Sequence, residues 1–283
     1  MKIGYLTPYS PDEVAFAAEA GFGSLELNSG SGETMSAEKI LSGGAEEMRS
    51  TTKKYGIEIS ALACYVNHLN PDLEKRKQRN DYLRKLIDAA KALGVGVVCT
   101  FAGRMPELSV EQNIPIFKEV FSPLAEYAQK QGVKIAIENC PMMHGHPFRG
   151  DNIAYSPYVW EMMFDAVDSD YLGLEFDPSH LYWQQIDEVA ATRRFGDKIY
   201  HVHAKDTEIM SDVLAYRGVM EPGWWRFRVP GWGEVDWQGF ISALIDAGYD
   251  GSLAIEHEDP VFHGDRFREG LKRGLKFLSQ FLV

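Results

Sequence analysis

The stretch LGLEFDPSH, residues 172–180, joins an apolar, strand-like run to an acid, a proline and a histidine. A strand that served only the hydrophobic core would not end with Glu175, Asp177 and His180 within six residues. Polar side chains at the carboxyl end of a buried strand are typical of a functional site on an α/β fold. The remaining strand-like runs show whether this ending is isolated.

Seven further runs have the same strand-like character. They are KIGYLT, SLELN, IEISALACYV, VGVVCTFAG, KIAIEN, IYHVHAKD and SLAIEHE. Longer stretches with helical periodicity lie between them, and many of these stretches close on a glycine, the expected C-terminal stop of a helix. Strict alternation of strand and helix requires parallel strands with right-handed crossovers. Eight such units predict an α/β fold of the (β/α)8 TIM barrel type, as a single domain over residues 1–283.

A doubly wound open sheet is the alternative fold. It is disfavoured because the first strand-to-helix turn, LTPYSPDE, has no glycine-rich phosphate-binding sequence. The same absence removes the usual sign of a dinucleotide site. The one long segment without a clear pattern, residues 207–236, follows the seventh strand and is expected to be an irregular functional loop.

Composition excludes several classes of protein. With 41 acidic and 29 basic residues the formal net charge is −12, which disfavours a nucleic-acid partner. The three cysteines lack CxxC spacing, so neither a zinc ribbon nor a disulfide framework is expected. The chain contains no uninterrupted apolar stretch of the roughly 18 residues that a membrane helix needs. We therefore expect a cytoplasmic protein that does not bind membranes.

Polar side chains end four consecutive strands of the predicted ring. These residues are Glu138 and Asn139; Asp177 and His180; His201, His203, Lys205 and Asp206; and Glu256 and Glu258. If the apolar residues of each strand face the helices, the charged residues face the barrel axis. Several buried carboxylates cannot lie together without a compensating charge. A set of carboxylates with an imidazole suits Mn²⁺, Co²⁺ or Mg²⁺, and Zn²⁺ is a further candidate.

Taken singly, these residues have ordinary structural explanations. A strand-end glutamate is often a salt-bridge partner, and the Asp177-Pro178 step is also a turn or helix-cap signal. Turn chemistry, however, would not place an acid or a histidine after an apolar run on four consecutive strands. His144 and His146 lie on no predicted strand and are not expected to bind metal.

Other residues are candidates for substrate contact. Glu26 and His68 end the second and third predicted strands, where each could line the pocket. The aromatic segment PGWWRFRVPGWGEVDW, residues 222–237, fits a lid, surface packing or a contact in a homo-oligomer equally well.

At these residues the chain resembles the sugar phosphate isomerase/epimerase family of xylose isomerase-like TIM barrels, which includes ketose 3-epimerases, inosose dehydratases and AP endonucleases. The resemblance covers essentially the whole chain. It is most specific at IAIEN, FDPSH, HVHAKD, VPGWGEVDW and IEHED, in that order.

The resemblance implies a set of roles. One divalent metal ion would be held by Glu138, Asp177, His203 and Glu256, and Glu138 and Glu256 would also act as acid and base. His180 and Arg228 match positions that hold substrate oxygens. Independently of the resemblance, Lys205 and His68 are also expected to contact substrate.

The implied activity is that of a metal-dependent isomerase or epimerase of a ketose-like sugar or keto-polyol, acting through an enediolate. The alternative is a metal-dependent lyase or dehydratase that uses the same enolisation, of the inosose dehydratase or keto-glycoside type. A third hypothesis is a barrel that binds a sugar or a metal ion but catalyses no reaction. AP endonuclease activity is not expected, because the chain has only 8 histidines and no matching set on its early strands. Glu175 and Glu258 depart from the simplest epimerase pattern and leave the identity of the sugar open.

Overall fold

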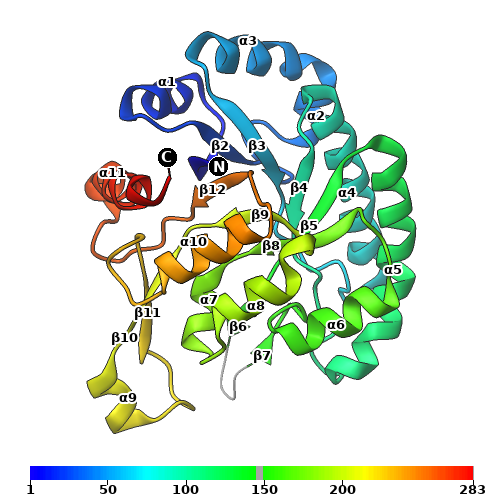
Figure 1. Cartoon of the computed structure of the whole chain (residues 1–283). Helices are drawn as coiled ribbons and strands as arrows, with labels where there is room; N and C mark the ends of the chain where they lie inside the picture. The colour runs from blue at the N-terminus through cyan, green and yellow to red at the C-terminus, as the bar shows by residue number, and fades with distance from the viewer. Residues whose placement is uncertain (145–148, 283) are drawn as a thin grey trace.

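Eight parallel strands close into a barrel in the computed structural model, which describes residues 1–144 and 149–282. The barrel strands are β1 (Lys2–Pro8), β2 (Ser24–Asn28), β3 (Glu58–Ala63), β4 (Val97–Thr100), β5 (Lys134–Glu138), β8 (Leu172–Phe176), β9 (Ile199–His203) and β12 (Ser252–Ile255). Their order around the ring is β1, β12, β9, β8, β5, β4, β3, β2, and helices surround them (Figure 1). Each predicted run contains one barrel strand, so the (β/α)8 prediction is confirmed.

Helices occupy every predicted helical stretch. The larger ones are α1 (Pro11–Ala20), α3 (Ala45–Tyr55), α4 (Leu73–Leu93), α5 (Val110–Gln131), α6 (Pro157–Ala166), α8 (Glu188–Phe195), α10 (Trp237–Asp246) and α11 (Phe267–Leu278). Asp72 caps the start of α4, and Ser109 forms a capping box with Gln112 at the start of α5. The short helices α2 (Ala37–Lys39), α7 (Pro178–Trp183) and α9 (Ser211–Arg217) were not predicted.

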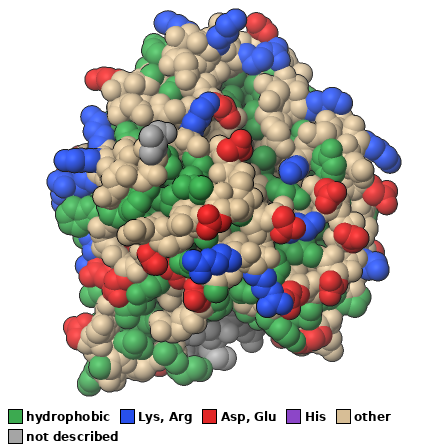
Figure 2. Space-filling view, viewed as in Figure 1, with side chains coloured by type: hydrophobic (Ala, Val, Ile, Leu, Met, Phe, Trp, Pro, Cys, Tyr) green, Lys and Arg blue, Asp and Glu red, His purple; other side chains and the backbone are tan. Residues whose placement is uncertain are grey.

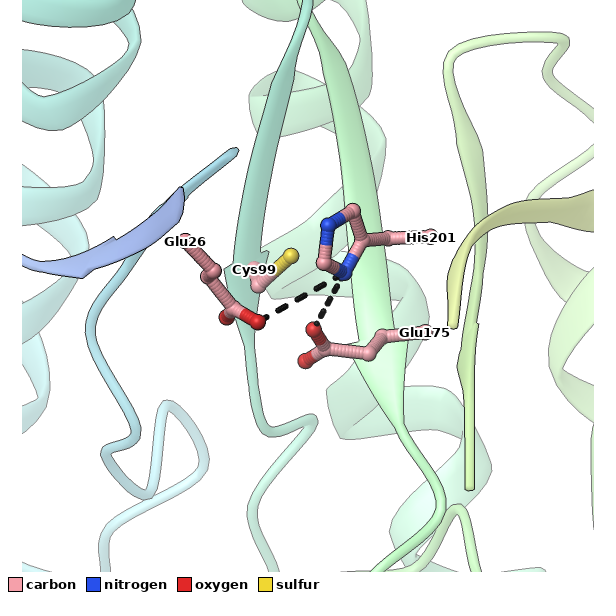
Figure 3. A group of neighbouring side chains, drawn as sticks. All are labelled: Glu26, Cys99, Glu175 and His201. Carbon is pink, nitrogen blue, oxygen red and sulfur yellow. Dashed lines mark hydrogen bonds and ion pairs between the residues drawn. The ribbon is translucent and has the colours of Figure 1, made fainter. Parts of the chain in front are cut away.

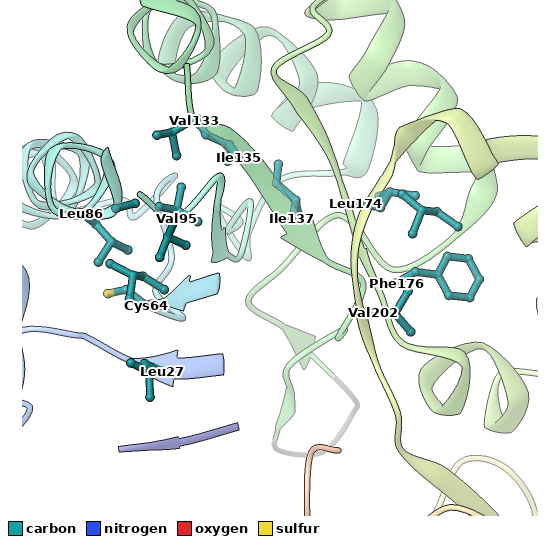
Figure 4. Close-up of a cluster of buried hydrophobic side chains, with 14 of the residues drawn as sticks. Leu27, Cys64, Leu86, Val95, Val133, Ile135, Ile137, Leu174, Phe176 and Val202 are labelled. Carbon is teal, nitrogen blue, oxygen red and sulfur yellow. The ribbon is translucent and has the colours of Figure 1, made fainter. Parts of the chain in front are cut away.

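The two faces of the barrel strands carry different side chains. On the outer face, Ile135 and Ile137 of β5 and Leu174 and Phe176 of β8 belong to a large apolar cluster between strands and helices (Figure 4). On the inner face the apolar side chains are small, and Ala61, Ala63, Cys99 and Ala136 form a separate buried cluster. Small inner residues leave volume along the barrel axis for the long polar side chains of neighbouring strands. The expectation that the charged face points inward is confirmed by contacts across the barrel, where Glu26 of β2 meets His201 and His203 of β9.

The segment after β9 is not the irregular loop that we expected. It contains an antiparallel pair, β10 (Asp206–Ile209) and β11 (Trp225–Arg228), joined through α9. This β10–α9–β11 extension projects from the barrel (Figure 1). The two strands were not predicted because a four-residue strand is too short to show a clear alternation of apolar and polar residues.

Asp206 organises the base of the β10–α9–β11 extension. Its Oδ1 accepts hydrogen bonds from the amides of Thr207 and Val235, and its Oδ2 accepts from the Gly231 amide and the indole of Trp237. A Cβ on Gly233 would lie 2.3 Å from Asp206 Oδ1, so only glycine fits there. These contacts explain why HAKD and the later VPGWGEVDW segment occur together in the sequence, because Asp206 of the first holds the backbone and the indole of the second.

A second small pair, β6 (Met143–His144) with β7 (Arg149–Gly150), follows β5 and was also not predicted. On the surface, acidic and basic side chains are interspersed over the face shown in Figure 2. Within the described residues, every helix is too short or too polar to cross a lipid bilayer.

Candidate active site

The four residues expected to bind metal lie together at the carboxyl ends of their strands. One ligand atom from each of Glu138, Asp177, His203 and Glu256 can be chosen so that all four lie within 4.8 Å of one another. Glu138, Asp177 and His203 are buried, and the side chain of Glu256 is 19% exposed. Three carboxylates and one imidazole in this space fit a divalent ion such as Mn²⁺, Co²⁺, Mg²⁺ or Zn²⁺. We call this group the upper cluster.

Each residue of the upper cluster is placed by the end of its strand. Glu138 and His203 are the last residues of β5 and β9, and Glu256 directly follows β12. Asp177 is the N-cap of α7, and its Oδ1 accepts a hydrogen bond from the Ser179 amide at 2.8 Å. Asp177 thus has the cap role that its sequence suggested, and its Oδ2 is directed to the site.

Asn139 fixes the ends of β5 and β8 relative to each other. Its side chain donates to the Asp177 carbonyl at 2.9 Å and accepts from the Asp177 amide at 2.7 Å. This pair of bonds continues the strand pairing one residue beyond β5. The asparagine in IAIEN therefore holds two metal-ligand candidates, Glu138 and Asp177, side by side.

A buried lysine lies among the carboxylates of the upper cluster. The ammonium group of Lys205 bonds Glu256 and Glu258 and is 3.2 Å from Asp177 Oδ2. Burial alone would lower the pKa of Lys205, but Asp177, Glu256 and Glu258 outweigh it and raise the pKa well above its usual value. Lys205 is therefore charged, and with His203 it holds the pKa of Glu256 well below its usual value against the effect of burial.

His180 lies beside the upper cluster. Its Nε2 is 3.2 Å from Lys205 Nζ, 3.5 Å from Asp177 Oδ2 and 3.6 Å from Glu138 Oε1. The ring packs edge-on against Phe227 of β11, which the Lys205 ammonium also faces at 4.4 Å. Two residues predicted to contact substrate, His180 and Lys205, are thus brought to the same place.

Arg228 lies outside the upper cluster. It ends β11 and is 6% exposed, and its guanidinium bonds Asp259 Oδ2 at 2.9 Å and the carboxylate of Glu208. This arginine connects the β10–α9–β11 extension to the segment after β12, where Glu256 and Glu258 also lie. Its expected contact with substrate stays a prediction.

His68 also lies outside the upper cluster. Both of its ring nitrogens are occupied, Nδ1 by Asn80 at 2.7 Å and Nε2 by Thr100 at 2.9 Å, and the side chain is buried. Burial lowers the pKa of His68 to about 4. The expected contact of His68 with substrate stays a prediction. Of the loop histidines, His144 is paired with Asp151 at 3.3 Å, and His146 lies outside the described residues.

Tyr65 is a polar member of the site that the sequence did not reveal. Its hydroxyl is 2.7 Å from Glu26 Oε1, 2.9 Å from Glu175 Oε2 and 3.1 Å from His203 Nε2. In the sequence it lies inside the predicted run IEISALACYV, with no feature that distinguishes it from the other tyrosines. Its contacts come from strands on several sides of the ring, so spacing along the chain could not reveal them.

The two nitrogens of His203 have different environments. Nδ1 faces the upper cluster, 3.2 Å from both Glu138 Oε1 and Glu256 Oε2. Nε2 faces deeper into the barrel, 3.0 Å from Glu26 Oε2 and 3.2 Å from Glu175 Oε1. An imidazole that binds metal through one nitrogen and donates from the other to a carboxylate has a fixed tautomer and ring orientation.

Two hollows flank the upper cluster. One, of about 290 Å³, is lined by His180 and Glu258 together with Trp183, Trp225 and Phe227. Trp183 and Trp225 stack with ring centroids 4.4 Å apart. The aromatic residues of the β10–α9–β11 extension therefore form one wall of this hollow.

The other hollow, of about 440 Å³, is lined by residues that include Tyr65, Arg79 and Asn28. Tyr65 connects it to the upper cluster through its bond to His203. Volumes of this size accommodate small molecules.

Comparisons with known proteins agree with this architecture. The chain is 27% identical over 99% of its length to the uncharacterized protein YfiH of Bacillus subtilis, of which it covers 99%. It is 26% identical over 62% of its length to an inosose dehydratase of Clostridium perfringens, of which it covers 62%.

Among solved structures, L-ribulose 3-epimerase superposes with a TM-score of 0.77 at 17% identity, covering 99% of this chain and 94% of that one. The IolI protein with a binding zinc atom superposes with a TM-score of 0.75 at 18% identity, covering 100% and 97%. At these identities the superpositions show the fold. A model of the xylose isomerase-like TIM barrel family matches residues 14–281. The chain therefore belongs to the xylose isomerase-like TIM barrel family.

Proposed function

We propose that this protein is a metal-dependent isomerase or epimerase that acts on a ketose-like sugar or keto-polyol through an enediolate. The observation that carries the proposal is the upper cluster, in which two glutamates converge with Asp177 and His203 within 4.8 Å. Strands β8 and β9 separate β5, which carries Glu138, from β12, which precedes Glu256. The two glutamates therefore approach a bound molecule from different sides.

Glu138, Asp177, His203 and Glu256 would hold the ion, with Mn²⁺, Co²⁺ or Mg²⁺ as the first candidates and Zn²⁺ as a further one. When bound, a divalent ion polarises a carbonyl and an adjacent hydroxyl and makes the carbon-bound proton between them more acidic. The fold neighbour IolI, whose structure contains zinc, supports a metal in this fold.

The chain's own residues then move the proton. One glutamate removes it from one face of the carbon, and the other returns it from the opposite face. The ammonium of Lys205, held at Glu256 and Glu258, neutralises charge on this side of the site. In this proposal Lys205 and His180 hydrogen-bond substrate oxygens.

A second candidate function is a dehydratase, and the likeness to inosose dehydratases favours it. Removal of the same proton leads to loss of water when the neighbouring carbon bears a hydroxyl leaving group. The Lys205 ammonium and the His180 ring, which lie beside the upper cluster, would then be candidate proton donors to that hydroxyl.

The test is to incubate the metal-loaded protein in deuterated water with free ketoses, keto-glycosides and inososes. Exchange of deuterium into a substrate, with products of unchanged composition, supports the isomerase or epimerase. Products that have lost one water identify the dehydratase. An absence of both exchange and products across the whole set would contradict enolisation and leave a binding protein.

A further inference from the structure

A second group of metal-binding side chains lies deeper in the barrel. Its members are Glu26 of β2, Cys99 of β4, Glu175 of β8 and His201 of β9 (Figure 3). One ligand atom from each can be chosen so that all four lie within 4.8 Å of one another. We call this group the lower cluster.

The lower cluster is one layer below the upper cluster. His201 precedes His203 by two residues on β9, so the two side chains face the same interior at successive levels, with ring centroids 6.4 Å apart. In Figure 3 the Nδ1 of His201 points between the carboxylates of Glu26 and Glu175, and the sulfur of Cys99 points into the same space. The Nδ1 atom is 2.9 Å from Glu175 Oε1 and 3.6 Å from Glu26 Oε2.

All four members of the lower cluster are buried, with exposures of 0–1%. Within the described part of the chain, no lysine or arginine is bonded or ion-paired to Glu26 or Glu175, whereas Lys205 serves the upper cluster. Their polar partners are Tyr65, His201 and His203. The imidazoles of His201 and His203 are the partners that can carry positive charge next to these two carboxylates, and a bound divalent ion would add a fixed charge between them.

The donor atoms select the kind of cation. Carboxylate oxygen, thiol sulfur and imidazole nitrogen are all ligand types that Zn²⁺ accepts, and four of them match its preferred coordination number. The upper cluster, in contrast, offers only oxygen and nitrogen. The sulfur of Cys99 therefore favours a softer ion at the lower level than the oxygen-rich upper cluster would select.

We propose that Glu26, Cys99, Glu175 and His201 form a second metal site of the closed, four-coordinate zinc type. When the ion binds, the Cys99 thiol loses its proton to solvent, and so does any proton shared by His201 and Glu175, so that four lone pairs face the ion. None of the four residues lines either hollow, and the Tyr65 hydroxyl lies between this site and the larger hollow. The site therefore stabilises the barrel rather than contacting substrate.

Metal content provides the first test. The purified protein is stripped with a chelator and reloaded with Zn²⁺ alone, and bound zinc is counted per chain. We expect two ions in the wild type, one in Cys99→Ser and two in Cys140→Ser. Cys140 is the matched control because it follows β5 beside the upper cluster and is not part of the lower cluster. One ion in the wild type, unchanged by Cys99→Ser, would overturn the proposal.

Cobalt spectroscopy provides the second test, and the wild type alone is enough to overturn the proposal. Reloading with Co²⁺ is expected to give the near-ultraviolet thiolate-to-cobalt charge-transfer absorption in the wild type and in Cys140→Ser but not in Cys99→Ser. Because no cysteine belongs to the upper cluster, this signal is independent of the proposed enzymatic function. A cobalt-loaded wild type without the absorption would show that the lower cluster is a hydrogen-bonded network and not a metal site.

Discussion

At the scale of single residues, the two glutamates of the upper cluster are expected to play opposite parts in proton transfer. Glu→Gln at either position keeps an oxygen ligand but removes the base. Glu138→Gln and Glu256→Gln should each retain some metal and lose turnover by a factor of about 10² or more. Each variant should also retain solvent-deuterium exchange with one epimer only, and with opposite preference.

Measurement of exchange into each epimer separately, alongside metal content, checks this prediction. Loss of exchange with both epimers in both variants at full metal content would contradict the two-base scheme. A single-base isomerase or a lyase would then fit better, with the second glutamate only a ligand.

His203 is expected to be required for metal at the upper cluster. Its Nδ1 faces Glu138 and Glu256 and the ring is buried, so His203→Ala removes a ligand without disturbing the outer core. Bound metal and activity should fall together while the circular dichroism spectrum is unchanged. Elemental analysis with the same Mn²⁺ or Co²⁺ content as the wild type would remove His203 from the site.

Glu26 is expected to position His203 without touching substrate. Its Oε2 lies 3.0 Å from His203 Nε2 and can accept the proton that fixes the ring for binding through Nδ1. Glu26→Gln should weaken binding of metal at the upper cluster by about 10- to 100-fold. Titration with Mn²⁺, an ion suited to the oxygen-rich upper cluster, measures this, with Glu126→Gln on the exposed surface of α5 as the matched control. Equal affinities in the two variants would exclude the positioning role.

At the scale of elements, the β10–α9–β11 extension is tied to the site by one arginine. Arg228 bonds buried Asp259, three residues after Glu256, and also Glu208 of β10. If Arg228 also holds a substrate oxygen, Arg228→Ala should lower kcat/KM. The fall should correspond to a loss of about 2 kcal/mol or more of transition-state stabilisation.

Arg226→Ala is the control for this prediction. Arg226 lies on the same strand and also pairs with Glu208, but its side chain is 36% exposed and it does not contact Asp259. Steady-state kinetics of Arg228→Ala within twofold of the wild type would limit Arg228 to holding the β10–α9–β11 extension in place.

At the scale of the whole molecule, one buried histidine makes stability depend on pH. The pKa of His68 is about 4 in the folded protein, lowered by burial, and about 6.5 when the chain is unfolded. Between these values the unfolded chain binds a proton that the folded chain does not, so stability falls as pH falls from about 6.5 toward 4. The loss between pH 7.5 and 5 should be on the order of 2 kcal/mol from this group alone.

Denaturant unfolding at pH 7.5 and 5 measures this effect as a difference between His68→Gln and the wild type. Glutamine retains a donor and an acceptor for Asn80 and Thr100 but does not titrate. The variant should lose less stability on acidification than the wild type. The same loss in both proteins would show that other groups account for the acid sensitivity.

The barrel and the grouping of the upper-cluster residues could both be predicted from the sequence. Strand-to-helix alternation fixes parallel pairing, and the carboxyl ends of parallel strands meet at one rim, so residues as distant as Glu138 and Glu256 could be placed together without coordinates. The same logic failed for β10 and β11, because four-residue strands held by one buried carboxylate, Asp206, carry no readable period.

Only the tertiary structure revealed the lower cluster and the two faces of His203. Glu175 and His201 are register partners on the neighbouring strands β8 and β9, and ring closure brings Glu26 and Cys99 of more distant strands to them. Closure superimposes inner side chains from non-adjacent strands in layers, and the register that decides which residues share a layer is set by pairing around the whole barrel. The sequence of one strand shows how far along that strand a residue lies. It does not show which residues of the opposite strands lie in the same layer of the barrel.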